Sequence, residues 1–462
     1  MKQIFKFSGA LCLLLAATFS ASTTYAQDEF IVGETTLTSS VLVDDARIPW
    51  ELVWGGDDML WCSERKGRVL RIDPSTGEYE TVLDLNVTFN GSGEPGLLGM
   101  VQHPDFPDDP RVWLAYCNGQ SNISEYLSVF EWNGTELVNE QELLSLPGAQ
   151  IHNGARLLIL PDNTILMTTG DAGNSANSQN LESLNGKILR INMDGSIPAD
   201  NPFPDSYVYT WGNRNAQGLC MSPDGIVYAS EHGQSNDDEF NIVEAGRNYG
   251  WPDVEGMCNT PDEADFCMEW DVRDPIRTWS PCIAVNGVEF YTHEAIPAWQ
   301  GKVLMAVLGG LSAQYERMSA LSLSEDGMTC TGEDQFFSSF NQRIRDIAVN
   351  PYTGAIYLAF NGTSYPGSPP NDIMEFRNLA YQSVDDLNAV SIEVYPNPAT
   401  DQAWISVHAG AVNADWSLID AAGRVVRNGK LSGRRGALAI DGLDAGAYIV
   451  RCAGTTHRLV IQ

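Results

Sequence analysis

Long apolar runs are almost absent from this chain of 462 residues. After residue 26, no segment reaches the roughly 18 uninterrupted apolar residues that a membrane-spanning helix requires. We therefore expect the mature protein to be soluble, with no membrane span. Long stretches of helical periodicity are missing as well, which argues against a helical fold.

Basic residues are few and acidic residues are many. The chain has 27 lysines and arginines against 60 aspartates and glutamates, which gives a formal net charge of −33. Such a charge repels phosphate backbones, so we expect no nucleic-acid partner. Solvation of a secreted surface explains most of the acidic residues, which leaves only a few as candidates for binding a cation.

The first 26 residues have the layout of a secretory signal. Lys2 and Lys6 precede an apolar run from Ala10 to Ala17, and small residues lead up to Ala26. This layout predicts a cleaved signal peptide over residues 1–26. We therefore expect the protein to be secreted or held at the cell surface, after export through the periplasm.

Cysteine is sparse, with nine residues, of which Cys12 leaves with the signal. The other eight would enter an oxidising compartment, where disulfides persist. Cys258 and Cys267 share a loop that contains glycine, aspartate and proline, and they are the favoured pair. Two free buried thiols remain the alternative, because pairing does not follow from sequence alone.

A turn followed by a short strand recurs along the chain. In four of these units a proline marks the turn, at Pro104, Pro161, Pro223 and Pro351, with spacings of 57, 62 and 128 residues. The last spacing is about two units, so we expect a further unit near Val285–Tyr291 and an earlier one at Leu52–Trp61. Six such units predict an all-β fold, a six-bladed β-propeller. An array of β-sandwiches is the alternative, but it does not explain a single period.

The repeat pattern stops after Phe376, and residues 381–389 are predicted to form a linker. Residues 390–462 have alternating strands separated by NP, AG and DG turns, which predict a small β-sandwich. The motifs VYPNPATD, SLIDAAGRVV and GLDAGAYIVR in this tail resemble the C-terminal sorting domain of the type IX secretion system. The resemblance implies the type IX secretion machinery as a partner. An adhesive or carbohydrate-binding β-module is the alternative.

Five further motifs occur in order before the tail. They are GEPGLLGMVQHPDF (Gly93–Phe106), IHNGARL (Ile151–Leu157), NGKILRINMDGSIPADNPF (Asn185–Phe203), the segment Tyr207–Pro252 with GNRNAQG and EHGQSNDDE, and QRIRDIAVNP (Gln342–Pro351). Together they resemble the soluble quinoprotein sugar dehydrogenases, which include glucose, aldose and sorbosone dehydrogenases. The resemblance covers roughly residues 40–376. It implies a β-propeller over residues 27–380 that holds pyrroloquinoline quinone (PQQ) and calcium.

The resemblance also implies catalytic roles. His152 matches the family's proton acceptor, which takes the proton of the sugar hydroxyl. A histidine that only bonds a neighbouring turn is the alternative. Arg214 would stabilise charge on the reduced quinone, and Asn215 and Gln217 would lie against the cofactor.

Arg343 and Arg345 match arginines that hold the carboxylates of the cofactor. Alternate residues of a strand face one side, so the spacing permits a paired anion clamp, although an R-x-R pair is commonly surface charge. Glu94 and Asp171 match positions on the sugar side of the pocket. An aspartate in a turn is also common for structural reasons alone.

Calcium is implied by the loop EHGQSNDDE. The family uses two successive loop carbonyls, here those of Gly233 and Gln234, and Glu239 matches a carboxylate of its structural calcium site. Oxygen ligands suit a hard cation. An acidic loop that is merely solvated is the alternative.

The chain departs from the family pattern at several positions. Gly309 and Gly310 replace a cofactor-binding lysine, and Asn213 replaces a histidine. The usual threonine is missing near Phe360, and Trp279 lies one position from the expected stacking tryptophan. Each departure weakens a contact to an anion or a ring.

We therefore expect a secreted aldose-type sugar dehydrogenase that uses PQQ and calcium and passes electrons to an external acceptor. The runner-up is a non-catalytic propeller, similar to the hedgehog-interacting-protein-like relatives, that binds a glycan or a protein. The retained His152 and the arginines favour the enzyme, whereas the missing lysine and threonine favour the binding protein. A calcium-dependent propeller lactonase has no support beyond acidic loops.

Overall fold

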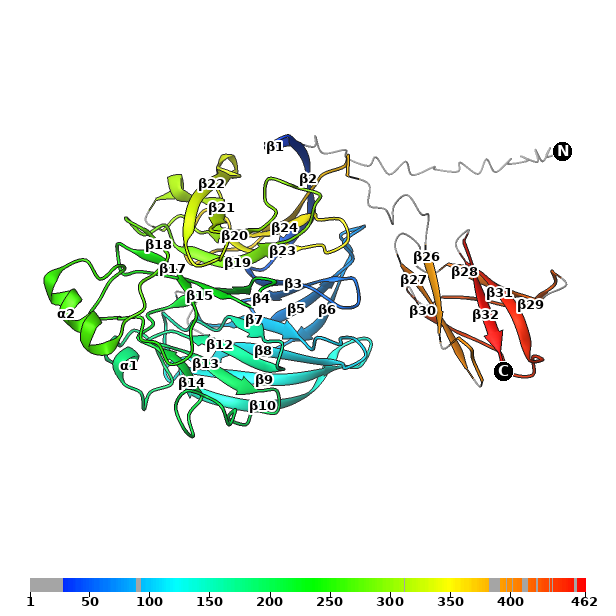
Figure 1. Ribbon diagram of the computed structural model, residues 1–462, viewed down its shortest axis with the longest axis horizontal. Coiled ribbons are helices and arrows are strands. Elements are labelled where there is room, and N and C mark those ends of the chain that lie inside the picture. The colour runs from blue at the N-terminus through cyan, green and yellow to red at the C-terminus, as the bar shows by residue number, and fades with distance from the viewer. Residues whose placement is uncertain are drawn as a thin grey trace, which may run out of the picture.

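The computed structural model of the chain (Figure 1) describes residues 28–88, 93–310 and 312–381 and, in the tail, 391–395, 397–400, 402–408, 414–420, 423–431, 433, 435–452 and 455–462. Strands make up most of its regular structure, which confirms the all-β class. The expected signal peptide (residues 1–26) and all but the first residue of the expected linker lie outside the described residues.

Residues 29–377 form six antiparallel sheets with propeller-like connectivity. The first sheet contains β3 (Pro49–Trp54), β4 (Leu60–Glu64), β5 (Arg68–Ile72) and β6 (Tyr79–Asp84), and the second contains β7 (Leu97–Gln102), β8 (Arg111–Asn118), β9 (Ser124–Trp132) and β10 (Leu137–Pro147). The third contains β11 (Leu157–Ile159), β12 (Thr164–Thr169), β13 (Lys187–Asn192) and β14 (Val208–Trp211), and the fourth contains β15 (Ala216–Met221), β16 (Val227–Glu231), β17 (Asp238–Ile242) and β18 (Arg277–Trp279). The fifth contains β19 (Val285–Tyr291), β20 (Lys302–Val307), β21 (Arg317–Leu323) and β22 (Cys330–Phe336). The sixth contains β23 (Ile344–Val349), β24 (Ile356–Phe360), β25 (Asn371–Arg377), β2 (Thr35–Ala46) and β1 (Glu29–Val32).

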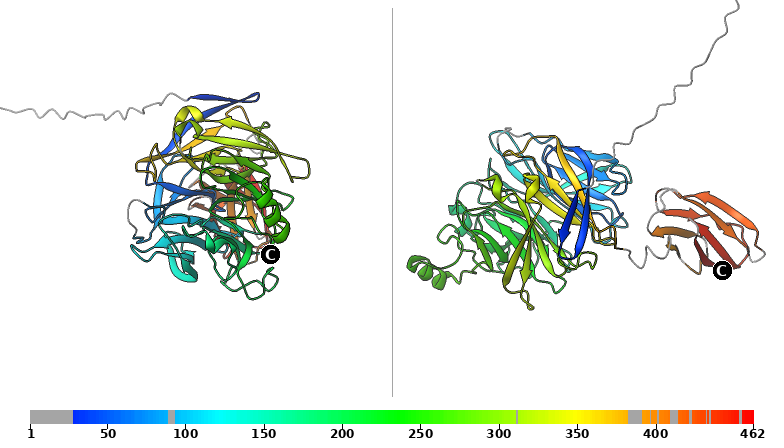
Figure 2. Two further views of the ribbon diagram at one scale, coloured as in Figure 1. Left: turned by 90° about the vertical axis from the view of Figure 1, so that its left-hand side faces the viewer. Right: turned by 90° about the horizontal axis from the view of Figure 1, so that it is seen from above.

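The first strands of these sheets form a closed ring. Contacts run from β3 to β7, from β7 to β11, and onward through β15 and β19 to β23, which returns to β3. Figures 1 and 2 show the sheets following one another in chain order within one body. The ring places residues from distant parts of the sequence around one axis.

Adjacent sheets share their apolar cores. Every residue of β4 and of β12 is buried, so these strands are covered on both faces. Trp113 of the second sheet lies in one cluster with Ile165 of the third. Met318 of the fifth sheet lies in another with Phe376 of the sixth. A sheet that is covered on both faces by its neighbours is characteristic of a propeller blade.

The sixth sheet joins the two ends of this region. β2 pairs with β25 in a register that sets Thr38 opposite Arg377, and the Thr38 hydroxyl donates a hydrogen bond to the Arg377 carbonyl at 3.2 Å. Figure 1 shows the blue β2 beside the yellow β24 and its sheet. The pairing therefore joins the beginning of this region to its end within one sheet.

The expected position of the fifth repeat is wrong by one strand. Val285–Tyr291 forms β19, the first strand of its sheet, whereas the other expected units, such as the turn at Pro223, lie between first and second strands. The matching turn of the fifth sheet contains Pro297 and leads into β20. An insertion between β17 and β18 lengthens the fourth sheet and shifts this unit along the sequence.

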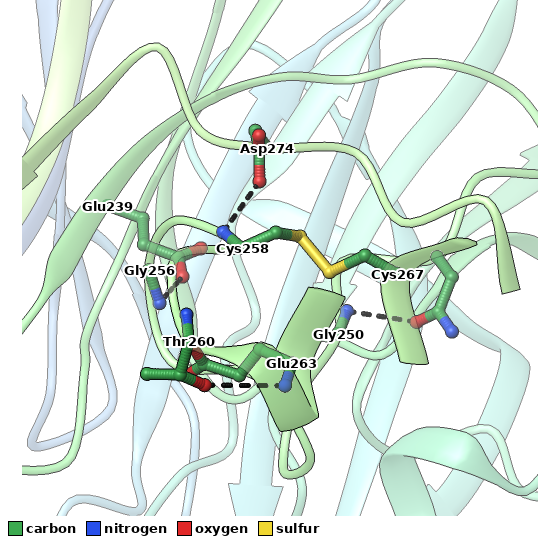
Figure 3. The surroundings of a disulfide bond; sticks show 9 residues. Glu239, Gly250, Gly256, Cys258, Thr260, Glu263, Cys267 and Asp274 are labelled. Atoms are coloured by element: carbon green, nitrogen blue, oxygen red, sulfur yellow. Dashed lines mark hydrogen bonds between the residues drawn. A yellow bond between two sulfur atoms is a disulfide. The ribbon is translucent and has the colours of Figure 1, made fainter. Parts of the chain in front are cut away.

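The insertion carries α2 (Pro261–Trp270), which Thr260 caps. The hydroxyl of Thr260 accepts a hydrogen bond from the Glu263 N–H at 3.3 Å, and the Glu263 carboxylate accepts one from the Thr260 N–H at 2.9 Å. A disulfide joins Cys258, just before the helix, to Cys267 within it (Figure 3). The bridge expected from the loop composition is therefore present.

The remaining helices are short. They are α1 (Ala176–Gln179), η1 (Ala313–Tyr315) and η2 (Ser338–Phe340). Among the residues that the structure describes, no helix is long and apolar enough to cross a membrane.

The tail has two sheets and a core of its own. One sheet contains β26 (Ser391–Tyr395), β27 (Ala403–His408) and β30 (Arg435–Leu438), and the other β29 (Val425–Lys430), β28 (Asp415–Ile419), β31 (Gly446–Cys452) and β32 (Thr455–Ile461). Ile405 of the first sheet shares a buried cluster with Leu418 and Val450 of the second. No residue before Ile392 belongs to this cluster as described.

Candidate active site

A cavity of about 360 Å³ lies where the first strands of the six sheets begin. Each sheet contributes to its lining: Trp50, Leu98, Gly154, Asn215 with Gln217, Ala284, and Arg343 with Arg345. Five of the predicted site residues line it, namely Glu94, Asn215, Gln217, Arg343 and Arg345. The ring thus gathers motifs from across the sequence into one site.

Three arginines line the cavity, Arg65, Arg343 and Arg345. Arg345 donates hydrogen bonds to the neutral oxygens of Gln217 at 3.1 Å and Asn286 at 3.0 Å. Burial, and then the charge of nearby Arg343, lowers the pKa of Arg345 to about 9. Burial also lowers the pKa of Arg343, whose Nε has no hydrogen-bond partner among the described residues. Buried positive charge of this kind favours an anionic ligand.

Two amides connect this wall to the segment that follows His152. Asn215 Oδ1 accepts a hydrogen bond from the Gly154 N–H at 3.2 Å and another from Gln217 Nε2 at 3.0 Å. Gln217 in turn accepts from Arg345. The amides therefore hold the arginine and the loop in fixed relative positions.

His152 lies beside the cavity rather than among the residues that line it. Its Nδ1 is 2.7 Å from Asp171 Oδ1, and its side chain is 16% exposed. Its φ of 58° lies in the left-handed region, which a residue with a side chain rarely adopts and which is common at functional sites. The Glu94 carboxylate accepts the His152 backbone N–H at 2.8 Å, which links the strained residue to the cavity wall.

Asp171 is buried and accepts three hydrogen bonds. Burial alone would raise the pKa of Asp171, but bonds from His152, Gly173 and Trp251 outweigh it and hold that pKa below its usual range. The carboxylate is therefore ionised near neutral pH. An ionised partner requires Nδ1 of His152 to carry the proton, which leaves Nε2 able to accept one.

Arg214 lies next to this pair but lines a different, smaller cavity. Its guanidinium lies over the Trp251 ring, 5.2 Å from the ring centre, and donates to the His232 carbonyl at 3.1 Å. Trp251 itself donates to Asp171 at 3.0 Å. His232 lines both cavities, so the two adjoin.

Two of the three predicted calcium ligands, Gly233 and Glu239, line the smaller cavity, which has a volume of about 10 Å³. Gln234 is exposed and does not line it. Burial, and then the charge of Glu231, raises the pKa of Glu239 well above its usual range. In the described part of the chain, no three side chains of His, Cys, Asp or Glu converge as a metal site. A cation at this place would therefore need backbone carbonyls as further ligands.

The residues of the main cavity that the sequence did not predict include four with aromatic or basic side chains, Trp50, Arg65, His232 and Tyr365. The Trp50 ring lies under Arg345, 5.4 Å from its guanidinium. Tyr365 donates to Glu94 at 3.1 Å. Apart from His232, which belongs to the EHG segment, these residues stand outside the recognised motifs, and only the closed ring brings them together.

The departures from the family pattern have visible structural outcomes. Gly310 lines the main cavity where a lysine was expected, whereas Trp279 donates its indole N–H to Glu333 at 2.9 Å on an outer strand. Asn213 is buried and donates to Glu231 at 3.0 Å. The cavity therefore keeps its arginines but lacks the lysine.

Comparison with known families matches residues 46–365 to the glucose/sorbosone dehydrogenases. This chain belongs to that family. Residues 393–462 match the C-terminal sorting domain of a secretion system, so the tail of this family member is a sorting domain. A sorting domain indicates export to the surface or the medium.

Two of the proteins that the chain resembles are named as sugar dehydrogenases. The chain is 34% identical over 250 residues to quinoprotein glucose dehydrogenase B of Acinetobacter calcoaceticus, across 47% of this chain and 52% of that protein. It is 28% identical over 356 residues to the aldose sugar dehydrogenase YliI of Escherichia coli, across 71% and 91%. The structure is similar to the PQQ-bound aldose sugar dehydrogenase of Streptomyces coelicolor, with a TM-score of 0.62 and 29% identity over 74% of this chain and 98% of that one.

Proposed function

We propose that this chain is an exported dehydrogenase that oxidises an aldose-type sugar with PQQ and calcium and passes electrons to an external acceptor. Its six sheets are the blades of a six-bladed propeller, and its tail is a small β-sandwich that the type IX machinery recognises after the chain reaches the periplasm. The observation that carries the proposal is the pairing of His152 with Asp171 beside a cavity walled by arginines.

The donor set of the cavity suits PQQ, a quinone with several carboxylates. Arg343 and Arg345 line it together, and the Nε atom of Arg343 has no partner among the described residues. His232 adds a buried Nε2 that is likewise without a described partner. Carboxylates would satisfy these donors, because charge-assisted hydrogen bonds to guanidinium groups are among the strongest in proteins. A volume of about 360 Å³ is large enough for a ligand of this kind.

His152 acts as the base in this proposal. Because Nδ1 of His152 donates its proton in a hydrogen bond to Asp171, Nε2 of His152 can take the proton of a sugar hydroxyl placed beside the cavity. Glu94 fixes the backbone of His152, and Trp251 fixes the far oxygen of Asp171. The imidazolium that forms is stabilised by the ionised aspartate.

When bound, PQQ would supply the acceptor for the hydride of the sugar carbon, and calcium would supply positive charge to the site. Arg214, held by the Trp251 ring and the His232 carbonyl, would add positive charge next to the His152–Asp171 pair. The backbone carbonyls of Gly233 and Gln234 would hold this calcium, and the Glu239 carboxylate would hold calcium at a structural site. Glu239 suits this role because a cation would offset both the burial and the repulsion by Glu231 that raise its pKa.

Comparison of wild type with His152→Ala tests the proposal. Both proteins are loaded with PQQ and calcium, and both are scored for quinone absorbance and for aldose-dependent reduction of a dye. We expect equal loading but a turnover lower by at least about 10²-fold in His152→Ala. His457→Ala, which changes a partly exposed histidine of the tail, is the matched control and should behave as wild type.

Equal rates in wild type and His152→Ala would remove His152 from the mechanism. If neither protein takes up PQQ, the chain is instead a non-catalytic propeller that binds a glycan or a protein.

A further inference from the structure

A second large cavity, of about 390 Å³, lies at the opposite end of the ring. We call it the distal cavity. Its lining comes from the ends of first strands and the turns that follow them: Val53, Trp54, Gly55, Gly56, Val101, Gln102, His103, Pro104, Ile159, Pro351 and Tyr352. The arginine cavity is lined by the starts of the same strands. About 13 Å of strand separates Trp50 in one cavity from Trp54 in the other.

We propose that the distal cavity binds a neutral sugar ring of a glycan. None of its lining residues is a lysine, arginine, aspartate or glutamate. A charged ligand would find no opposite charge there, and the protein's net charge of −33 disfavours acidic polymers in particular. The ligand must therefore be neutral.

Aromatic rings form one wall of the distal cavity. Tyr352 is 56% exposed, and its ring meets the Trp54 ring edge-on at 6.3 Å. Tyr357 stacks against Trp54 at 6.0 Å and fixes its orientation. Rigid aromatic side chains give a large contact area at little entropic cost, and the C–H face of a pyranose ring packs well on such a surface.

A buried amide provides the polar contact. Gln102 is 9% exposed, and its Oε1 accepts the Gly56 N–H at 3.3 Å. Its Nε2, in contrast, has no hydrogen-bond partner in the described structure. A buried donor without an acceptor is unfavourable, and rotation of the Gln102 amide toward the cavity would let a sugar hydroxyl accept its hydrogen bond.

His103 completes the wall in a fixed position. Its Nδ1 accepts the Asp105 N–H at 3.1 Å, its Nε2 is 3.4 Å from Asp109 Oδ2, and its ring stacks on Trp113. The cavity thus combines aromatic and apolar walls with a single unsatisfied amide donor, a pattern typical of sites for small neutral ligands with a polar edge. Such a site would hold the exported protein on a polysaccharide while the arginine cavity remains open.

Methyl glycosides of glucose, galactose and mannose are suitable probes, because they lack the free anomeric hydroxyl. Binding to the full-length protein is measured by saturation-transfer NMR and by isothermal titration. We expect at least one glycoside to bind with a Kd on the order of 1 mM. Tyr352→Ala should weaken that binding by about 10-fold or more, and Ile159→Trp, which fills the cavity, should abolish it.

Two further variants separate recognition from general damage. Gln102→Glu keeps an acceptor for the Gly56 N–H but removes the free donor, so it should weaken glycoside binding as well. Trp270→Ala removes an exposed aromatic ring of α2, far from the distal cavity in sequence, and should change nothing. Because Tyr352 is exposed, Tyr352→Ala should fold and should oxidise sugars at the wild-type rate.

The proposal is overturned if none of the glycosides binds wild type, or if binding is the same in Tyr352→Ala and Gln102→Glu. It is also overturned if indole binds and displaces every glycoside, since the cavity is then a site for planar aromatic compounds. Loss of sugar oxidation with intact glycoside binding would contradict only the proposed catalytic function.

Discussion

The carboxylate of Asp171 accepts hydrogen bonds from His152 on one oxygen, at 2.7 Å, and from Trp251 on the other, at 3.0 Å. The aspartate thus holds the imidazole and also the indole on which Arg214 lies. A single buried carboxylate therefore positions both groups that are proposed to act on the sugar and the quinone.

Replacement of this carboxylate should impair turnover more than binding. In Asp171→Asn the amide can donate to Nδ1 of His152 and favour the wrong tautomer, so we expect kcat to fall by about 10²-fold or more, with KM changed only slightly. Steady-state dye reduction measures both. Asp194→Asn, in an exposed turn, is the control. A double variant with His152→Ala should be no slower than His152→Ala alone, and additive losses would show that the aspartate acts independently.

Arg345 should lower the stability of the cofactor-free protein but strengthen the binding of PQQ. Its guanidinium is buried and has neutral partners, so Arg345→Gln should raise the melting temperature of the cofactor-free protein. The same variant should take up PQQ at least about 10-fold more weakly, because a charge-assisted contact is lost. Differential scanning calorimetry and quinone absorbance measure the two effects. Arg424→Gln, at an exposed arginine of the tail, should show neither.

Because of Glu125 on β9, we expect the stability of the protein to fall as the pH rises. It is fully buried, neither of its carboxylate oxygens has a described partner, and burial raises the pKa of Glu125 well above its usual range. Above the pKa of the unfolded chain, the folded state binds more protons, so stability falls as pH rises. Glu125→Leu should therefore stabilise the protein by about 1–3 kcal/mol at pH 8 and by less at pH 4.

Urea unfolding at the two pH values measures this difference. Glu131→Leu, at an exposed position of the same strand, should change stability by less than about 0.5 kcal/mol at either pH. A gain for Glu125→Leu that does not depend on pH would mean that the carboxylate is ionised in the folded state.

The tail should be dispensable for folding of the propeller. Its core cluster contains no residue before Ile392, so the two parts share no apolar cluster among the described residues. We expect a chain of residues 27–380 to be soluble, with a main melting transition within about 3 °C of that of the full-length protein. Insolubility, or a much lower melting temperature, would contradict this.

The sequence predicted the parts of the site that lie in motifs at the starts of first strands. Arg343 and Arg345 belong to one such motif, and the structure places both in the main cavity. Trp50 and Arg65 could not be predicted in this way. Trp50 lies on β3 and Arg65 directly follows β4, in a part of the chain without a recognised motif, and the closed ring brings them to the site. The fifth repeat was misplaced because the insertion with α2 changed a spacing that the other repeats keep.

The pairing of β2 with β25 has a consequence for how the protein folds. Thr38 and Arg377 are 339 residues apart, so this contact can form only after nearly the whole propeller chain is available. Until then, β25 has an unpaired edge on the side that β2 will cover, and unpaired edges join readily to strands of other chains. The contact that has to wait for the whole propeller chain is therefore the one that covers this edge. We expect the chain to be most prone to aggregation before the sixth sheet closes.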